Sequence, residues 1–241
     1  MQLIPATVPG YQISSLSDRA VMVSFGNILD EAINDIVLSL HKTLQLSPFP
    51  GYVESVPAYA SMAVFYDIKK INTQGEVSPV SLVKNYLQQL LETPLQANTP
   101  LSSIKKIPVC YDELFGIDLK GIAELHQFSI DEIISLHTAV IYKVYMIGFL
   151  PGFAYMGTVD NKLITPRKDQ PRLNVAAGSV GIAGAQTGIY PMDSPGGWQI
   201  IGKTPLHLFD ITQSTPCLLS AGDRVQFISI SLDEFNATHV H

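Results

Sequence analysis

The segment between Gly148 and Gly202 constrains the fold more than any other part of the sequence. Ten of the 17 glycines in the 241-residue chain lie in it, and between Leu173 and Ile201 the only charged residue is Asp193. Short apolar stretches alternate there with glycine, proline, serine and aspartate. Many short strands joined by tight turns are typical of a small closed β structure. We therefore expect a β-barrel in the second half of the chain.

The first part of the chain has a different pattern. Apolar residues alternate over 20–25, as in a strand, and recur at helical spacing over 30–46 and 79–91. Two apolar runs, 52–56 and 60–68, lie between these helices and are predicted to be strands. This order of elements predicts an antiparallel sheet covered by two helices.

The sequence therefore predicts an α+β protein with two domains. A small N-terminal α/β sandwich-type domain is expected over 1–92 and a β-barrel domain over 104–232. Residues 93–103 contain two prolines and no periodicity, so they are predicted to be a linker. Residues 233–241 are predicted to be a flexible tail.

The second domain is expected to open with a strand over 104–110 and two short helices, 117–127 and 130–136. Ser129 and Glu132 have the spacing of a capping box, in which each side chain satisfies a free amide of the first helical turn. This pair predicts where the second helix begins.

Composition excludes several classes of protein. The chain has 15 basic and 21 acidic residues, a net charge of −6, and no basic run, which excludes a nucleic-acid-binding footprint. Hydrophobic residues make up 46% of the chain, which excludes disorder through low hydrophobicity. No signal peptide and no membrane-spanning stretch is predicted, so we expect a cytoplasmic protein. Cys110 and Cys217 are interpreted as two thiols rather than a disulfide.

Residues Gly197 to Thr204 match the formal pattern of a P-loop. A working P-loop needs a flexible loop whose amides turn toward phosphate, followed by a helix. Here the interior is bulky and strand-like, and Pro205 follows directly. We interpret the segment as a strand with a turn at each end.

Two segments are candidate binding elements. The corner that contains Phe149, Phe153 and Tyr155 is aromatic, uncharged and fixed by Pro151 and Gly152, so it can present ring faces to a pocket or partner or simply pack on a barrel. The glycines of 177–188 would let backbone amides approach a ligand, with neutral groups from Ser179, Gln186 and Thr187 beside them. A glycine-rich β corner without a ligand is the alternative.

Three charged or titratable residues are also candidates. His137 lies at a predicted helix end and is a candidate acid or base, or a structural hydrogen-bond partner. Arg167 and Arg172 bracket a polar segment and either anchor a carboxylate or phosphate or form surface salt bridges. No Ser-His-Asp arrangement, zinc-ligand spacing or carboxylate pair is found, and no metal site is predicted.

The second half of the chain also resembles a known family. The motifs that carry the resemblance are 145–155, 165–167, 177–184, 186–191, 194–198, 201–205, 208–210 and 221–224. With these motifs the chain is similar to the allophanate hydrolase subunit 1 domain family, which includes the B subunit of 5-oxoprolinase and Kip-type inhibitors of a sporulation histidine kinase. The resemblance covers the chain from about residue 17 to about residue 230. Ala176 and Ala185 depart from the family pattern, in which proline and glycine are usual.

The resemblance implies a fold and a function. It implies that the barrel is cyclophilin-like and that the chain is one subunit of an ATP-dependent 5-oxoprolinase, which opens the lactam of 5-oxoproline to L-glutamate. The implied partners are a cyclophilin-like C subunit and a separate A subunit of 5-oxoprolinase, and related domains form the carboxyltransferase part of urea carboxylases. Direct inhibition of a histidine kinase is the alternative function. Prolyl isomerisation rests on fold analogy alone.

The expected site lies in the barrel domain and combines both segments. ATP is the expected co-substrate of the complex, and no other cofactor is implied for this chain. The expected catalytic groups are His137, Ser179, Gln186 and Thr187. The expected substrate-binding residues are Phe149, Phe153, Tyr155, Arg167, Arg172, Gly178, Gly181 and Trp198.

Overall fold

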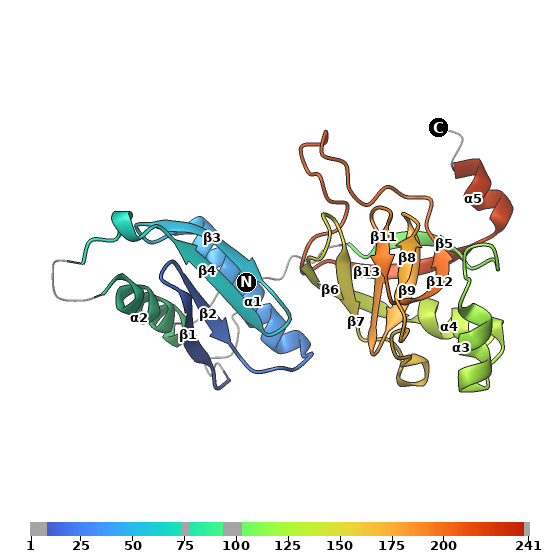
Figure 1. Ribbon diagram of the computed structural model, residues 1–241, viewed down its shortest axis with the longest axis horizontal. Coiled ribbons are helices and arrows are strands. Elements are labelled where there is room, and N and C mark those ends of the chain that lie inside the picture. Colours follow the sequence, from blue (N-terminus) through green and yellow to red (C-terminus); the bar gives the residue numbers. More distant parts are fainter. Residues whose placement is uncertain (1–8, 74–77, 94–102, 239–241) are drawn as a thin grey trace. The chain divides into compact units, whose positions relative to one another are not determined.

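The computed structural model describes residues 9–73, 78–93 and 103–238 (Figure 1). The chain divides into two compact units between residues 101 and 102, which we call the N-terminal and C-terminal units. Most of the predicted linker, 94–102, lies outside the described residues.

The N-terminal unit is an antiparallel sheet in the order β1-β2-β4-β3, with two helices (Figure 1). Its elements are β1 (Gln12–Ser17), β2 (Ala20–Ser24), α1 (Glu31–Leu46), β3 (Tyr52–Pro57), β4 (Ser61–Tyr66), the short 3₁₀ turn η1 (Ile68–Lys70) and α2 (Pro79–Glu92). The strands and helices predicted from periodicity are all present, and β1 is an additional edge strand.

Local chemistry fixes where the helices begin. The Asp30 carboxylate accepts a hydrogen bond of 2.9 Å from the backbone N of Ile33 and so caps α1. Ser78 caps α2 just before Pro79, a residue that suits the first turn because its missing N–H would have no partner there. Both helices contribute to one apolar core with Val21, Val23, Met62 and Val64 of the sheet, so they cover the same face.

The C-terminal unit is built on a closed barrel with strand order β10-β7-β6-β13-β5-β12-β9. A two-stranded ribbon, β8 with β11, is separate from it. The elements of the unit are β5 (Lys105–Cys110), α3 (Leu119–His126), α4 (Ile130–Ala139), β6 (Ile141–Ile147), β7 (Ala154–Gly157), η2 (Asn161–Leu163), β8 (Arg172–Val175), β9 (Ser179–Ala183), β10 (Gln186–Ile189), β11 (Ser194–Gly196), β12 (Gln199–Lys203), β13 (Arg224–Ile230) and α5 (Leu232–Thr238). The expected α+β class with a barrel is confirmed.

The inside of the barrel is filled by side chains. Val144, Met156, Val180, Val225 and Phe227 are fully buried in one apolar core. Successive residues of a strand point to opposite faces, so the residues between these positions lie on the outer wall. A site for a small molecule on this unit therefore has to be built on the outside of the barrel.

Two segments that the sequence analysis singled out are settled by the backbone. The P-loop match forms strand β12, paired with β9 and β5, as its bulky interior predicts. The capping box at the start of α4 is also confirmed, with Ser129 and Glu132 bonded reciprocally.

The predicted flexible tail is wrong for residues 233–238, which belong to helix α5. The backbone N of Ser231 donates to the Glu234 carboxylate at 2.8 Å, and the backbone N of Glu234 donates to Ser231 Oγ at 3.2 Å. Phe235 is buried, and its ring centroid lies 4.5 Å from that of Phe115. A capped first turn and one buried aromatic hold this short helix. Residues 239–241 lie outside the described part of the chain.

Candidate functional site

An aromatic cluster covers the outer wall of the barrel. Phe153 lies at its centre, with ring centroids 4.7 Å from Tyr155, 5.2 Å from Tyr190 and 5.4 Å from Trp198. Neighbours of these residues on β7, Ala154 and Met156, belong to the inner core. Because side chains alternate along strand β7, its aliphatic residues face the inside of the barrel and its aromatic residues face the outside.

Glycine makes room for these rings. A Cβ atom at Gly188 would lie 2.9 Å from Trp198 Cζ3 and 3.1 Å from Phe153 Cζ, and one at Gly181 would lie 3.1 Å from Trp198 Cβ. At Gly178, φ is +82° and a Cβ would lie 2.6 Å from the Thr204 carbonyl oxygen. Gly178 and Gly181 therefore serve close packing, and neither lines the pocket described next.

The outer rings frame a hollow of about 220 Å³, which we call the aromatic pocket. It brings together five of the residues expected from the sequence, namely those at positions 149, 153, 155, 167 and 198. Its lining is Phe149, Phe153, Tyr155, Arg167, Pro171, Tyr190, Pro195, Gly196, Gly197 and Trp198. Tyr190 was missed by the sequence analysis, although its spacing of two from Gly188 places it on the same outer face.

The corner before β7 holds one ring at the rim of the aromatic pocket. Phe149 has φ of +70°, an uncommon conformation for a residue with a side chain, and is 62% exposed. Its ring meets Phe153 edge to face at 5.6 Å. Gly152 has φ of +83°, and a Cβ atom at this position would lie 2.9 Å from Phe209 Cβ. Backbone held in such a conformation is characteristic of functional loops.

Arg167 supplies the pocket with a positive charge. Its guanidinium lies over the Trp198 ring, 5.9 Å from the centroid. The backbone is fixed on both sides, because Gln199 Nε2 donates to the Pro166 carbonyl at 3.1 Å and Lys168 N donates to the Gly197 carbonyl at 2.8 Å. Within the described residues, no ion pair is found for Arg167.

Arg172 has a different role. Its Nη2 lies 2.6 Å from Asp118 Oδ1, and Lys168 Nζ lies 3.0 Å from the same oxygen. The other carboxylate oxygen accepts from the Ile200 backbone N at 2.7 Å. Burial by itself raises the pKa of Asp118, but the hydrogen bonds from Arg172, Ile200 and Lys168 outweigh it and hold the pKa below its usual value. Arg172 is thus paired with Asp118 and does not line the pocket.

His137 and Thr187 belong to a buried chain of hydrogen bonds. His137 Nδ1 lies 2.8 Å from Tyr111 Oη, and Nε2 lies 3.0 Å from Thr187 Oγ1, which itself donates to the Gly181 carbonyl. Since the Thr187 proton is used there, Nε2 of His137 is the donor and Nδ1 the acceptor. Burial lowers the pKa of His137 to about 3, so the ring is neutral at pH 7.

The expected second wall of neutral donors is therefore not part of the aromatic pocket. Thr187 points inward because it alternates with Gly188, and Ser179 is 6% exposed on β9. Gln186 is half-buried at the start of β10, opposite Gly157 and Ala183. By strand alternation Gln186 shares the outer face with Gly188, but it lies outside the lining.

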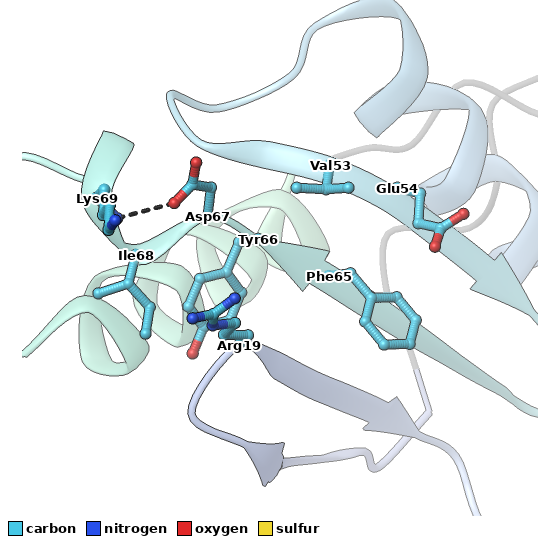
Figure 2. Close-up of a pocket in the computed structure, with 8 residues that line it drawn as sticks. All are labelled: Arg19, Val53, Glu54, Phe65, Tyr66, Asp67, Ile68 and Lys69. Carbon is cyan, nitrogen blue, oxygen red and sulfur yellow. Dashed lines mark hydrogen bonds between the residues drawn. The ribbon is translucent and has the colours of Figure 1, made fainter.

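A second hollow, of about 660 Å³, lies on the N-terminal unit (Figure 2). Figure 2 shows Val53 and Glu54 from β3, Phe65 and Tyr66 from β4, and Arg19 from the turn between β1 and β2. Charges of both signs line it, and the Asp67 carboxylate already accepts from the backbone N of Lys69 at 3.0 Å. None of the residues that the sequence singles out lies there, so the aromatic pocket is the candidate site.

Metal-binding clusters and membrane-spanning helices are not found in the described part of the chain. Over residues 9–73, 78–93 and 103–238, no cluster of three or more His, Cys, Asp or Glu side chains is placed to hold a metal ion. In the same residues, no helix has the length and apolarity needed to span a bilayer.

The fold and the pocket define the class of this protein. It is an α+β protein with a closed barrel, and the outer wall of the barrel carries a pocket lined by aromatic side chains and one cation, Arg167. The model of the family described as carboxyltransferase domain, subdomain C and D, matches residues 11–219. The chain belongs to this family.

Relatives extend this assignment along the whole chain. The chain is 44% identical over 230 residues to the B subunit of 5-oxoprolinase from Bacillus subtilis (strain 168), covering 94% of this chain and 96% of that protein. The crystal structure of TTHA0988 superposes with a TM-score of 0.77 and 35% identity over 88% of this chain, which spans only 40% of TTHA0988. The conserved uncharacterized protein PH0987 of Pyrococcus horikoshii is 40% identical, with a TM-score of 0.54 over 93% of this chain and 100% of its own. The family resemblance is confirmed.

Proposed function

We propose that this chain is the B subunit of an ATP-dependent 5-oxoprolinase. In the complex, 5-oxoproline is opened to L-glutamate while ATP is hydrolysed to ADP and phosphate. The observation that carries the proposal is the 44% identity to a protein named as the B subunit of 5-oxoprolinase over nearly the full length of both chains. The proposed partners are the C and A subunits of such a complex, in the cytoplasm.

The aromatic pocket supports a binding role in this reaction. Pockets that hold drug-sized ligands enclose roughly 300–1,000 Å³, so the 220 Å³ here suit a smaller molecule such as a five-membered lactam. Flat rings and one cation offer stacking surface and a charged contact, without an obvious nucleophile among the lining residues. A chain of this kind binds and orients a substrate and depends on other subunits for the chemistry.

The chemistry itself needs activation of an unstrained amide. Transfer of the ATP γ-phosphoryl group to the lactam oxygen releases ADP and leaves a carbon that one water attacks. Opening of the C–N bond then frees the amine and leaves an acyl phosphate, which a second water hydrolyses to the glutamate carboxylate and phosphate. Charge that develops on oxygen is stabilised by donors that are already in place. Of the donors expected from the sequence we propose Gln186 for this role, because His137 and Thr187 are engaged with each other and Ser179 is covered. Since Gln186 shares the outer face of β10 but lies outside the lining, the role requires that the reacting carbonyl project from the aromatic pocket toward Gln186.

Reconstitution tests the proposal. The chain is purified together with its candidate A and C partners, and ADP release is measured with and without 5-oxoproline. The expected result is 5-oxoproline-dependent ADP release by the complex and none by the chain alone. A folded, assembled complex without turnover would refute the proposal. The alternative from the family resemblance instead predicts that the chain alone, at stoichiometric concentration, blocks autophosphorylation of a histidine kinase.

A further inference from the structure

Among the described residues, the three cations near the aromatic pocket differ in how their charge is balanced. Asp118 binds both Arg172 and Lys168, at 2.6 and 3.0 Å, so both cations are already engaged in ion pairs, although they share a single negative charge. Arg167 lines the pocket, and within the described residues no carboxylate lies within ion-pair distance of it. The sequence left Arg167 and Arg172 as equal candidates, and this geometry separates them.

The main chain on both sides of Arg167 is held before any ligand arrives, while its exposed side chain lies over the Trp198 ring. Its neighbours Pro166 and Lys168 are bonded through their main chain to Gln199 and Gly197. The guanidinium lies over Trp198, which leaves its edge available for a planar anion. Donors that are held in place bind with less loss of side-chain entropy than mobile ones.

The surroundings strengthen a charged contact at this point. The rings of Phe153 and Trp198 are almost fully buried and form apolar walls, whereas Arg167 itself is exposed, so a ligand carboxylate at this point is shielded from water on the side of the rings. Burial raises the pKa of Tyr155 and of Tyr190, and the positive charge of Arg167 opposes the rise in both. For Tyr190, a hydrogen bond with the Trp198 backbone and the charge of Arg172 also oppose the rise in pKa.

We propose that Arg167 is the specificity-determining residue of the aromatic pocket and binds the carboxylate of a small ring-shaped ligand. The ring of such a ligand lies against the aromatic walls, while its carboxylate, ionised at neutral pH, accepts hydrogen bonds from the guanidinium. Neutral lactams of the same size lack this contact and bind more weakly. The inference rests on the proposed function, because 5-oxoproline is a five-membered lactam that carries one carboxylate.

Three small molecules test the contribution of the lactam ring and that of the carboxylate separately. 5-Oxoproline has the lactam and the carboxylate, 2-pyrrolidinone has only the lactam, and cyclopentanecarboxylate has only the ring and the carboxylate. Dissociation constants are measured by calorimetry for the full chain and for the reconstituted complex. We expect 5-oxoproline and cyclopentanecarboxylate to bind and 2-pyrrolidinone to bind at least roughly tenfold more weakly than 5-oxoproline.

Variants at Arg167 test the residue itself. Arg167→Met should weaken 5-oxoproline binding by roughly 10- to 100-fold, the loss typical of hydrogen bonds to a charged group, and leave 2-pyrrolidinone unchanged. Arg167→Lys should recover part of the loss, because it keeps the charge but not the two-pronged geometry. Lys120→Met, which removes an exposed cation on α3, is the matched control and should change nothing.

The outcomes distinguish this inference from the function on which it rests. Arg167-dependent carboxylate binding by a complex without turnover supports the inference and refutes the function. Turnover with an unchanged KM in folded Arg167→Met overturns the inference and leaves the function standing. Equal binding of 2-pyrrolidinone and 5-oxoproline, or no binding of 5-oxoproline by either preparation, also overturns the inference.

Discussion

Asp118 should be the most costly single carboxylate to neutralise in the C-terminal unit. Its side chain is 8% exposed and accepts hydrogen bonds from Arg172, Lys168 and the backbone N of Ile200. Asp118→Asn keeps an acceptor for Ile200 but removes the one negative charge that Arg172 and Lys168 share. Losing one partner of a buried ion pair costs about 3–5 kcal/mol. Since the side chains of Arg172 and Lys168 are 24% and 32% exposed, water can partly replace it, and we expect a loss of about 2 kcal/mol.

A single fluorophore makes this loss measurable. Trp198 is the only tryptophan of the chain and belongs to the cluster that Asp118 supports, so its fluorescence reports unfolding of the C-terminal unit in urea. Asp169→Asn, which changes an exposed carboxylate next to Lys168, is the control. Its free energy of unfolding should stay within about 0.5 kcal/mol of that of the parent chain. Equal midpoints for the two variants would refute the assigned role of Asp118.

The pH dependence gives a second test of the same carboxyl group. Because the pKa of Asp118 is lower in the folded state, its contribution to stability is present above the unfolded pKa of about 3.9. That contribution is lost as the pH falls through the folded pKa. Asp118→Asn should therefore flatten the acid limb of the stability curve. An unchanged acid limb would contradict the ion-pair geometry.

Three further changes probe the wall, the core and the reaction. Gly188→Ala places a methyl group 2.9 Å from Trp198 and should cost about 1–3 kcal/mol in urea unfolding, whereas Gly121→Ala, with nothing within 4 Å, should not destabilise the chain. His137→Gln should remove a loss of stability of about 1.4 kcal/mol per pH unit between about pH 6.5 and 3, because only the unfolded state binds that proton. A matching slope in both proteins would contradict a neutral buried ring. Gln186→Ala should lower turnover of the assembled complex by roughly 10²–10³, and full activity would exclude Gln186 as the oxyanion donor.

Elements with strong periodicity and local caps could be predicted from the sequence. Helix α1 has apolar residues at helical spacing and Asp30 directly before it, so both its existence and its start are encoded locally. Strand β1 has three serines among its six residues and no alternation of apolar side chains, so only pairing with β2 defines it. Ser231 and Glu234 have the spacing of a capping box, a local signal for α5 that the prediction of a flexible tail over 233–241 did not use.

The site could be predicted only in part, because its partners are distant in sequence. The aromatic corner was found from its composition and Trp198 from a motif of the family resemblance, and both line the pocket. Nothing local distinguishes Arg167 from Arg172, since the partner of Arg172 is Asp118, 54 residues away. Glycine-rich strands also hide which face is inward, because both Gly181 and Gly188 could have faced either side.

The register of the strands links the core to the pocket. In β10, Thr187 bonds His137 inside the barrel, while the next residue, Gly188, supports the rings of Phe153 and Trp198 outside it. A slip of one residue would exchange these faces, exposing a buried hydrogen-bond chain and displacing the aromatic wall. The Thr187–His137 bond therefore favours the same register as the buried apolar residues Val180, Ile182 and Ile189 of the paired strands, although neither of its side chains lines the pocket. In this way two polar residues far apart in the sequence support the arrangement of the outer wall from inside the barrel.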